Sequence, residues 1–471
     1  MPTLSLGHLL AALSGYRPTG NEPVVQSMEI DSRQAVAGSV FAAFVGEHVD
    51  GHRFIGGAFQ RGAMAALVEQ PVAFPTLDLR DAALIPQWDG QLPICLRVDS
   101  TEAALQQIAR YWRKQFNVRV IGVTGSVGKT TTKELTATVL KQKYATLKSE
   151  KNFNTEIGLP LQLLRMNDTH ERAVIEMGMY VIGDIALLAS VAEPEVGVIT
   201  NVGTVHVERA GSQAAIAQGK RELVEALSAD GVAILNADDP LVMQMAAHTQ
   251  ARVMTYGESA EADLRATDIE PLGAKGMRFT LCHNGEMIPV TMPLRGRHSV
   301  MTALRAAAVG LVEGLSWDEI VRGLQSHQDD LRMVLRQATN GATIVDDSYN
   351  ASPQSTIAAL DLLNELEGRK VAVLGDMLEL GSDEAAGHAR VGVRALDVVD
   401  EIVTVGARAR LIGCEMTRLG FSAEKLHSVS NSAEAIPVVQ KILNSADTVL
   451  IKGSLGANMA IIVKAIVADS N

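Results

Sequence analysis

Short apolar runs alternate with segments of helical periodicity along most of the chain. Residues 118–123 have the length and the β-branched content of a buried strand, and Leu135, Val139 and Leu140 then recur at helical spacing. Further elements of the same kind are the strands 173–175 and 196–201, the helix 213–227 and the strand and turn 232–240. This alternation of strands and helices predicts a doubly wound α/β domain.

The regions on either side of this central part predict two more domains. Before it, a helix from Gly57, a strand at 65–68 and a helix at 100–115, capped by Ser100 or Thr101, indicate a small α/β domain. After it, four strands with intervening helices predict a Rossmann-like layer: 342–347, 371–381, 401–406 and 448–454. No Gly-x-Gly-x-x-Gly follows these strands, so no dinucleotide site is inferred. Because 471 residues suffice for about three domains, we expect the boundaries 1–113, 114–330 and 331–471.

Composition and charge narrow the function class. No apolar run reaches the roughly 18 residues that span a bilayer, so no membrane association is expected. The apolar stretch 4–13 has no basic residue before Arg17, which favours a docked first helix over a signal peptide, and we expect a cytoplasmic protein. Cys95, Cys282 and Cys414 are scattered, as in reduced proteins without a zinc site. The net charge of −12 argues against nucleic-acid binding, and no exposed apolar stripe calls for a partner chain, so a monomer is expected.

A glycine-bearing loop between the strand 118–123 and the following helix is the clearest chemical signal. Gly125 and Gly128 allow backbone conformations in which successive N–H groups converge on phosphate oxygens at a helix N-terminus. Lys129 adds a cation, and Thr130 stands where a P-loop places its magnesium ligand. The loop is shorter than the common P-loop, since Val123 occupies the position of the leading glycine. The alternative is an ordinary glycine turn, but Gly-Lys-Thr-Thr in this context favours nucleotide phosphates.

Other polar residues follow predicted strands, where open parallel sheets bind ligands. Glu176 ends one strand, and His206 and Glu208 follow the next. Asn236 and Asp238 either contact a nucleotide or cap the next helix. Judged by itself, Lys220 would be a solvated helix charge. The N-terminal pair of segments Asp31-Ser32-Arg33 and Asp50-Gly51-His52 holds either a polar ligand or only turns and surface groups.

Taken together, these segments resemble the Mur ligase family, whose members make peptidoglycan precursors, over nearly the whole chain. The resemblance rests on the segments 124–131, Asn152-Phe153-Asn154, Glu176-Met177-Gly178, 200–206 and Lys220. It implies an α/β fold of three-domain Mur ligase architecture, with a small N-terminal α/β domain, a central P-loop ATPase-like domain and a C-terminal Rossmann-like domain.

Two C-terminal segments, 346–353 and 374–381, are similar to those of the family member that adds the last dipeptide. This similarity implies an ATP-dependent ligase that joins D-alanyl-D-alanine to UDP-N-acetylmuramoyl-tripeptide through an acyl phosphate. Such a reaction serves cell wall biogenesis, cell shape and cell division. The third residue of the tripeptide is left open between a diamino acid and lysine.

The resemblance also implies roles for individual residues. Lys129, His206 and Lys220 would be catalytic, with Lys220 carbamylated. Magnesium would be held by Thr130, Glu176, His206 and Lys220. ATP would be bound by Thr124, Gly125, Ser126, Val127, Gly128, Lys129, Thr130, Thr131, Arg332, Asp347 and Asn350. The UDP-substrate would be bound by Ser32, Arg33, Asp50 and His52, beside the matching Asp31.

Four positions depart from the family pattern: Met179, Ser299, Thr302 and Leu455 stand where other residues are usual. Ser299 and Thr302 bear on adenine contacts and Leu455 bears on the incoming group, and none of the four is a phosphate or metal residue. Two rival interpretations are a folylpolyglutamate synthase-like ligase and a nucleotide-binding module without ligase activity. The 113 residues before the loop disfavour the first, and the intact Lys129, Glu176, His206 and Lys220 disfavour the second.

Overall fold

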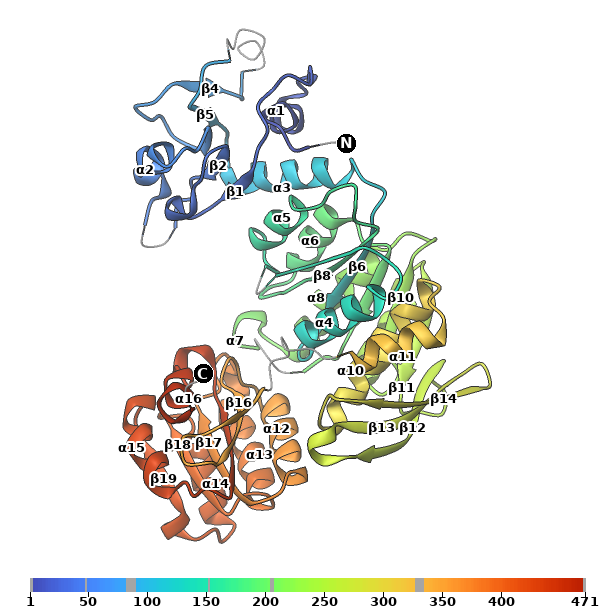
Figure 1. Cartoon of the computed structure of the whole chain (residues 1–471), viewed down its shortest axis with the longest axis vertical. Helices are drawn as coiled ribbons and strands as arrows, with labels where there is room; N and C mark the ends of the chain where they lie inside the picture. Colours follow the sequence, from blue (N-terminus) through green and yellow to red (C-terminus); the bar gives the residue numbers. More distant parts are fainter. Residues whose placement is uncertain are drawn as a thin grey trace. The chain divides into compact units, whose positions relative to one another are not determined.

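The computed structural model describes residues 3–46, 49–81, 90–150, 153–203, 207–326 and 334–468. These residues form three β-sheets of five, nine and six strands (Figure 1). The chain packs as two compact units, one of Met1–Gly122, Tyr144–Gly178 and Asp184–Glu195 and the other of Val123–Lys143, Met179–Gly183 and Val196–Asn471. Among the described helices, none has the length and apolar character needed to cross a membrane.

The N-terminal sheet has the order β1-β2-β3-β5-β4, and its paired strands run parallel. The predicted first helix is confirmed as α1, in which Ser5 caps the helix and His8 bonds back to the Ser5 backbone. The predicted helix capped by Ser100 is α3. The bounds of these elements are α1 (Leu6–Ser14), β1 (Ser27–Glu29), β2 (Ser39–Ala42), α2 (Ile55–Gln60), β3 (Ala65–Val68), β4 (Thr76–Asp78), β5 (Ile94–Arg97) and α3 (Thr101–Arg113).

The nine-stranded sheet has the order β14-β13-β12-β11-β10-β9-β6-β8-β7. Its strands are β6 (Arg119–Thr124), β7 (Thr146–Lys148), β8 (Arg172–Glu176), β9 (Val196–Ile199), β10 (Val232–Asn236), β11 (Arg252–Gly257), β12 (Leu264–Pro271), β13 (Met277–His283) and β14 (Glu286–Met292). The predicted buried strands are confirmed as β6, β8, β9 and β10. The prediction missed the antiparallel extension β12–β13–β14.

Helices accompany this sheet in the alternation that the sequence predicts. They are α4 (Lys129–Leu140), α5 (Gly158–Leu163), α6 (Asp184–Ala192), α7 (Val207–Ala210), α8 (Gln213–Glu225), α9 (Pro240–Met243), α10 (Arg297–Val312) and α11 (Trp317–Gln325). Helix α10 begins at Arg297 and packs against α4. Gly296, which has a positive φ of 77°, ends the preceding segment directly before the helix.

The C-terminal sheet has the order β15-β16-β20-β17-β18-β19, with β15 antiparallel to β16 and the other pairs parallel. The four predicted strands are confirmed as β16, β17, β18 and β20, while β15 and β19 were missed. The bounds are β15 (Val334–Gln337), β16 (Thr343–Asp347), α12 (Pro353–Glu365), β17 (Arg369–Gly375), α13 (Glu384–Leu396), β18 (Glu401–Val405), α14 (Arg410–Arg418), β19 (Leu426–Val429), α15 (Ser432–Ile442), β20 (Asp447–Lys452) and α16 (Ala460–Ile466).

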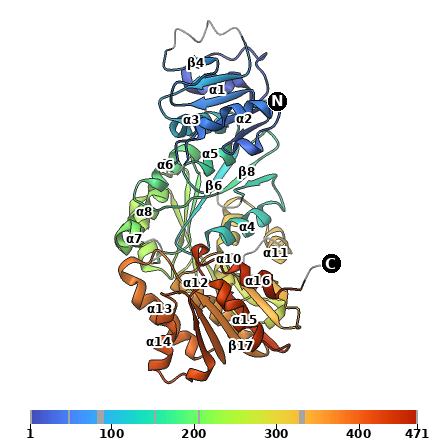
Figure 2. The same cartoon turned by 90° about the vertical axis from the view of Figure 1, so that its left-hand side faces the viewer.

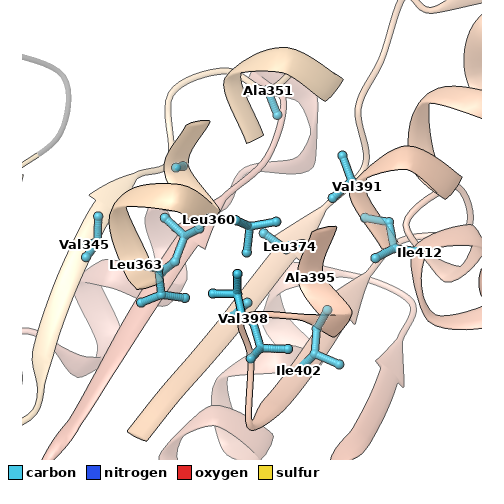
Figure 3. Packing of buried hydrophobic residues seen from close by; sticks show 14 of the residues in the cluster. Val345, Ala351, Leu360, Leu363, Leu374, Val391, Ala395, Val398, Ile402 and Ile412 are labelled. Carbon is cyan, nitrogen blue, oxygen red and sulfur yellow. The ribbon is translucent and has the colours of Figure 1, made fainter. Parts of the chain in front are cut away.

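Helices cover both faces of the C-terminal sheet. Because successive strand residues point to opposite sides, each central strand contributes side chains to two cores. Ala372 and Leu374 of β17 join a core with α12, α13 and α14, which Figure 3 shows from close by. Val371 and Val373 join a second core with α15 and α16 on the other face (Figure 2). This two-sided burial explains why β17 and β20 read as continuous apolar runs in the sequence.

Candidate active site

The loop after β6 has a backbone conformation that glycine adopts readily and that other residues rarely adopt, as a phosphate cradle requires. Gly125 has a φ of 146° and Gly128 a φ of 84°. A Cβ atom added to Gly125 would lie 1.8 Å from Oγ1 of Thr200, so no other residue fits there without a shift. Helix α4 starts at Lys129 without a side-chain N-cap. Its N-terminus therefore faces the loop with backbone N–H groups rather than with a capping side chain.

Thr200 and Asn201, which follow β9, hold the loop in this shape. The N–H of Val127 donates to Oδ1 of Asn201 at 3.0 Å, and Nδ2 of Asn201 donates to the Val127 carbonyl at 3.0 Å. Oγ1 of Thr200 donates to the same carbonyl at 2.7 Å. The N–H of Ser126 donates to the Asn201 carbonyl at 3.0 Å, and the N–H of Gly203 donates to Oγ of Ser126 at 2.8 Å. This segment belongs to the family motif 200–206, but its support of the loop was not predicted from the sequence.

Two lysines from different elements are electrostatically coupled beside the loop. Nζ of Lys129 donates to the carbonyls of Gly125 at 2.8 Å and Ser126 at 3.4 Å. Lys220 on α8 is only 3% exposed, so the expectation from the residue alone, a solvated helix charge, is wrong. Burial, and then the positive charge of Lys129, lowers the pKa of Lys220 well below its ordinary value. A neutral amine is therefore favoured at this position.

Met179, one of the departures from the family pattern, packs against Gly219, the residue before Lys220. Met179 is buried, and its Cε lies 2.4 Å from the position of a Cβ added to the neighbouring Gly219. Glycine at 219 thus leaves the room that the methionine side chain fills. Met179 contributes apolar surface beside α8, the helix that carries Lys220.

Glu176 is the last residue of β8, and its side chain is held in a fixed orientation. The residue is 2% exposed. Its Oε1 accepts a hydrogen bond from Nδ2 of Asn154 at 2.8 Å, and its backbone N–H donates to Oγ of Ser149 at 3.0 Å. The carbonyl of Asn154 accepts the N–H of Gly178 at 2.8 Å, which fixes the turn after the strand. Asn154 therefore helps to orient the carboxylate.

Five residues of the predicted motifs lie outside the described residues: Asn152, Thr204, Val205, His206 and Arg332. Their predicted roles remain predictions.

Asn236 and Asp238, for which two roles were open, are engaged in hydrogen bonds within the protein. Nδ2 of Asn236 donates to the Thr200 carbonyl at 3.1 Å. The carboxylate of Asp238 accepts the backbone N–H groups of residues 258–259. Asp239, not Asp238, caps the next helix, α9. Asn236 thus supports the segment after β9, in which Thr200 holds the loop.

The N-terminal polar residues form two similar turns. Asp31 caps a 3₁₀ turn and pairs with Arg33 at 2.7 Å, and hydrogen bonds from Arg33 lower the pKa of Asp31 to about 2. Ser32 opens this turn. Asp50 caps the second turn and contacts Nδ1 of His52 at 2.7 Å.

His52 is buried, and both of its ring nitrogens have partners within the protein. Nε2 accepts the N–H of Glu69 at 3.0 Å, so Nδ1 carries the ring hydrogen and donates it to Asp50. The side chain of Arg33, by contrast, is 83% exposed. Of the four predicted substrate-binding residues, Arg33 presents its charge to solvent, while His52 supports the end of β3.

The structure brings the two described C-terminal ATP candidates together around a lysine. Nζ of Lys452 contacts Oδ2 of Asp347 at 2.5 Å and donates to the Asn350 carbonyl at 2.8 Å. Lys452 is 2% exposed and Asp347 is 8% exposed, whereas the Asn350 side chain lies on the exposed turn. Lys452 was not among the site residues predicted from the sequence. Leu455, one of the departures, is 66% exposed.

Comparisons with known proteins agree with this arrangement. Family models match at residues 24–113 (Mur ligase family, catalytic domain), 123–310 (Mur ligase middle domain) and 331–455 (Mur ligase, glutamate ligase domain). The chain is 36% identical over 451 residues to the UDP-N-acetylmuramoyl-tripeptide–D-alanyl-D-alanine ligase of Bacillus subtilis, with 95% of this chain and 94% of that protein covered.

Solved structures give the same result. A crystal structure of MurF from Acinetobacter baumannii has a TM-score of 0.85 and 30% identity, with 98% of each chain covered. The MurF ligase of Thermotoga maritima in complex with ADP has a TM-score of 0.79 and 27% identity, with 94% of this chain and 97% of that chain covered. With its three-domain architecture and these relatives, the chain belongs to the Mur ligase family.

Proposed function

We propose that the chain is an ATP-dependent ligase that joins D-alanyl-D-alanine to UDP-N-acetylmuramoyl-tripeptide in peptidoglycan precursor synthesis. The observation that carries this proposal is the phosphate loop, held by Thr200 and Asn201 and bordered by the coupled pair Lys129 and Lys220. Relatives that align with nearly the whole length of the chain are named for this activity. We assign the domains to 1–113, 114–330 and 331–471, which enclose the three family-model matches.

The reaction has two steps. First, the tripeptide carboxylate attacks the γ-phosphorus of ATP, so that an O–P bond forms, the bond to the β-phosphate breaks, and ADP leaves. Second, the amine of the dipeptide attacks the acyl carbon, and inorganic phosphate leaves with the electrons of the C–O bond as the nitrogen loses a proton. Two anions must meet in the first step, and we assign to Lys129 and the N-terminus of α4 the positive potential that offsets their repulsion.

We assign the magnesium ligands to Thr130, Glu176, His206 and Lys220. The donor set that the first two offer, a hydroxyl and a carboxylate, consists of the oxygen atoms that Mg²⁺ prefers. The hydrogen bond from Asn154 gives Glu176 the fixed orientation that metal ligands generally have. When bound, the metal supplies charge compensation for the transferring phosphoryl group.

Lys220 is proposed to act as a carbamate. Carbamylation requires a neutral amine, whose nitrogen forms a bond to the carbon of CO₂ while a proton is released. Burial and the charge of Lys129 lower the pKa of Lys220 and so favour the neutral form. The carbamate replaces a nitrogen base by an anionic oxygen ligand, which suits a divalent cation.

The substrates are assigned to the outer domains. Ser32, Arg33, Asp50 and His52 would serve the UDP end, with Arg33 as the charge that meets the ligand and His52 as a support of its turn. The ATP residues would be the loop 124–131 together with Arg332, Asp347 and Asn350. We further propose that the enzyme works as a monomer in the cytoplasm, in a pathway that cell shape and division require.

A phosphate-release assay tests the function. With ATP, Mg²⁺ and UDP-N-acetylmuramoyl-tripeptide, release is expected only when D-alanyl-D-alanine is added, and mass spectrometry should show the joined product. Release without the dipeptide would contradict the assignment, because a folylpolyglutamate synthase-like enzyme or an ATPase would not need it. ADP binding without any turnover would instead identify a non-catalytic nucleotide-binding module.

The carbamate has a separate test. Lys220→Ala is expected to abolish turnover, which added bicarbonate does not restore, while ADP affinity changes little. With ¹³C-bicarbonate, the wild-type protein should show a carbamate resonance that the variant lacks. Lys141→Ala, at the exposed end of α4, is the control and should keep both activity and resonance. Near-normal activity of Lys220→Ala would refute the carbamate role.

A further inference from the structure

A buried arginine lies directly behind the phosphate loop. Arg305 is the one charged residue in the segment 302–312 of α10, and it is 5% exposed. Its Nη1 donates to Oγ1 of Thr132, in the first turn of α4, at 2.6 Å. Its Nε donates to the hydroxyl of Tyr256 on β11 at 3.1 Å. The guanidinium thus joins three elements of the nucleotide domain.

Its partners connect it to the loop itself. The Tyr256 hydroxyl donates toward the carbonyls of Ile199 at 2.9 Å and Thr200 at 3.0 Å, and Oγ1 of Thr200 donates to the Val127 carbonyl. A Cβ added to Gly128 would lie 3.0 Å from Nη1 of Arg305, so the guanidinium is packed against the loop at its second glycine. The arginine therefore acts on the loop through α4 and through the end of β9.

The charge of Arg305 has no carboxylate partner among the described residues. No ion pair between the described residues includes Arg305. Its hydrogen-bond partners are the neutral hydroxyls of Thr132 and Tyr256. A guanidinium stays charged under all physiological conditions. A buried charge whose partners are all neutral is costly in the free protein, and an anionic ligand nearby would offset that cost.

We propose that Arg305 is a positioning residue for nucleotide binding, which braces the phosphate loop and places a fixed positive charge beneath it for the phosphates of the bound nucleotide. This inference rests on the proposed function, since it assumes that the loop binds a nucleotide. Arg305 itself belongs to no phosphate-loop motif. The signal in the sequence is a single charged residue within the alanine-rich stretch 302–312 of α10.

The test compares ligands of different charge. The dissociation constants of ADP and of adenosine are measured for the wild type, Arg305→Gln and Arg305→Lys by ligand-observed NMR. Arg305→Gln should weaken ADP binding about tenfold, as expected for the loss of one buried positive charge beside the phosphate loop, and leave adenosine binding unchanged. Arg305→Lys keeps the charge and should recover most of the ADP affinity. In turnover assays, KM for ATP should rise more than kcat falls.

Arg113 provides a matched control. It is also a buried arginine, at 8% exposed, and its Nε donates to the Ala192 carbonyl at 3.0 Å. Arg113→Gln should lower thermal stability without changing the ratio of ADP to adenosine affinity. If Arg305→Gln does not fold, Arg305→Met, whose apolar side chain suits a buried position, gives the same comparison.

The outcomes separate this inference from the proposed function. Failure of the wild type to bind ADP would overturn the proposed function. ADP binding by the wild type that is unchanged in Arg305→Gln would overturn only the role of Arg305. Equal weakening of ADP and adenosine, or a Lys variant as weak as the Gln variant, would show a merely structural residue and would also overturn it.

Discussion

Replacing Gly125 by alanine should damage the phosphate loop through two separable effects. The first is backbone strain, because a φ of 146° is a conformation that residues with a Cβ rarely adopt, at a cost of about 1–3 kcal/mol. The second is a steric clash, since the new Cβ would lie 1.8 Å from Oγ1 of Thr200. Relief of the clash requires Thr200 to move and to lose its hydrogen bond to Val127, worth about 1 kcal/mol.

Gly420→Ala separates these two effects. Gly420 has a φ of 98°, and a Cβ added there meets no atom within 4 Å, so this variant carries backbone strain alone. Thermal unfolding of both variants should show a loss of stability, with the larger loss in Gly125→Ala. Only Gly125→Ala should also bind ADP more weakly. Because the loop must return to the crowded conformation to bind phosphate, an overpacking cost of about 1–3 kcal/mol at the contact with Thr200 predicts a loss of about 5- to 150-fold in ADP affinity.

Isothermal titration with ADP, below the unfolding temperature of either variant, measures this difference. If Gly125→Ala bound ADP as tightly as Gly420→Ala does, the contact between Gly125 and Thr200 would not determine the shape of the binding loop. The assignment of Thr200 and Asn201 as the residues that hold the loop would then be wrong.

Three further outcomes are expected. Arg33→Ala should raise KM for the UDP-substrate while leaving kcat and thermal stability nearly unchanged, whereas His52→Ala should mainly lower stability, as kinetics and thermal unfolding can show; the reverse pattern would contradict their assigned roles. Burial, assisted by the nearby positive charges of Arg305 and Lys452, lowers the pKa of His298 to about 4. The unfolded chain therefore binds a proton that the folded protein does not, and stability should fall as pH falls from about 6.5 to about 4, a dependence that His298→Gln should flatten in urea titrations at several pH values. Asp239→Ala removes the cap of α9 and the acceptor for the Val202 N–H, and should cost about 1–2 kcal/mol in the same titrations, while unchanged stability would refute the capping role.

The parts of the fold that the sequence predicted well are those in which burial is continuous. Strands β6, β8 and β17 are apolar runs because both of their faces are covered. Such a run can be recognised from its own residues without knowledge of the segments that cover it. Strand β13 carries an equally readable signal, since Met277, Phe279 and Leu281 are buried at every second position, but the prediction did not use it. Strand β19 is short and only partly buried, so its sequence carries little signal.

The candidate site was predictable only where residue type dictates chemistry. The glycines and Lys129 of the loop belong to this class. The burial of Lys220 does not, because it depends on packing by other elements. The state of His52 likewise depends on the Glu69 N–H, far along the chain, which determines which ring nitrogen carries the hydrogen. Interactions between distant segments decide such roles, and local patterns do not encode them.

The pair of Lys129 and Lys220 connects the electrostatics of the site with the proposed modification. In the unmodified protein, the charge of Lys129 opposes protonation of Lys220, as the lowered pKa of the buried amine reflects. A carbamate at Lys220 has the opposite charge, so the same proximity becomes an attraction. Lys129 would therefore favour the modification twice, first by keeping the amine neutral and reactive and then by stabilising the anion that forms. In this arrangement the lysine that is proposed to meet the phosphates would also maintain the proposed metal ligand, and the phosphate loop and the proposed metal site would act as a single electrostatic unit.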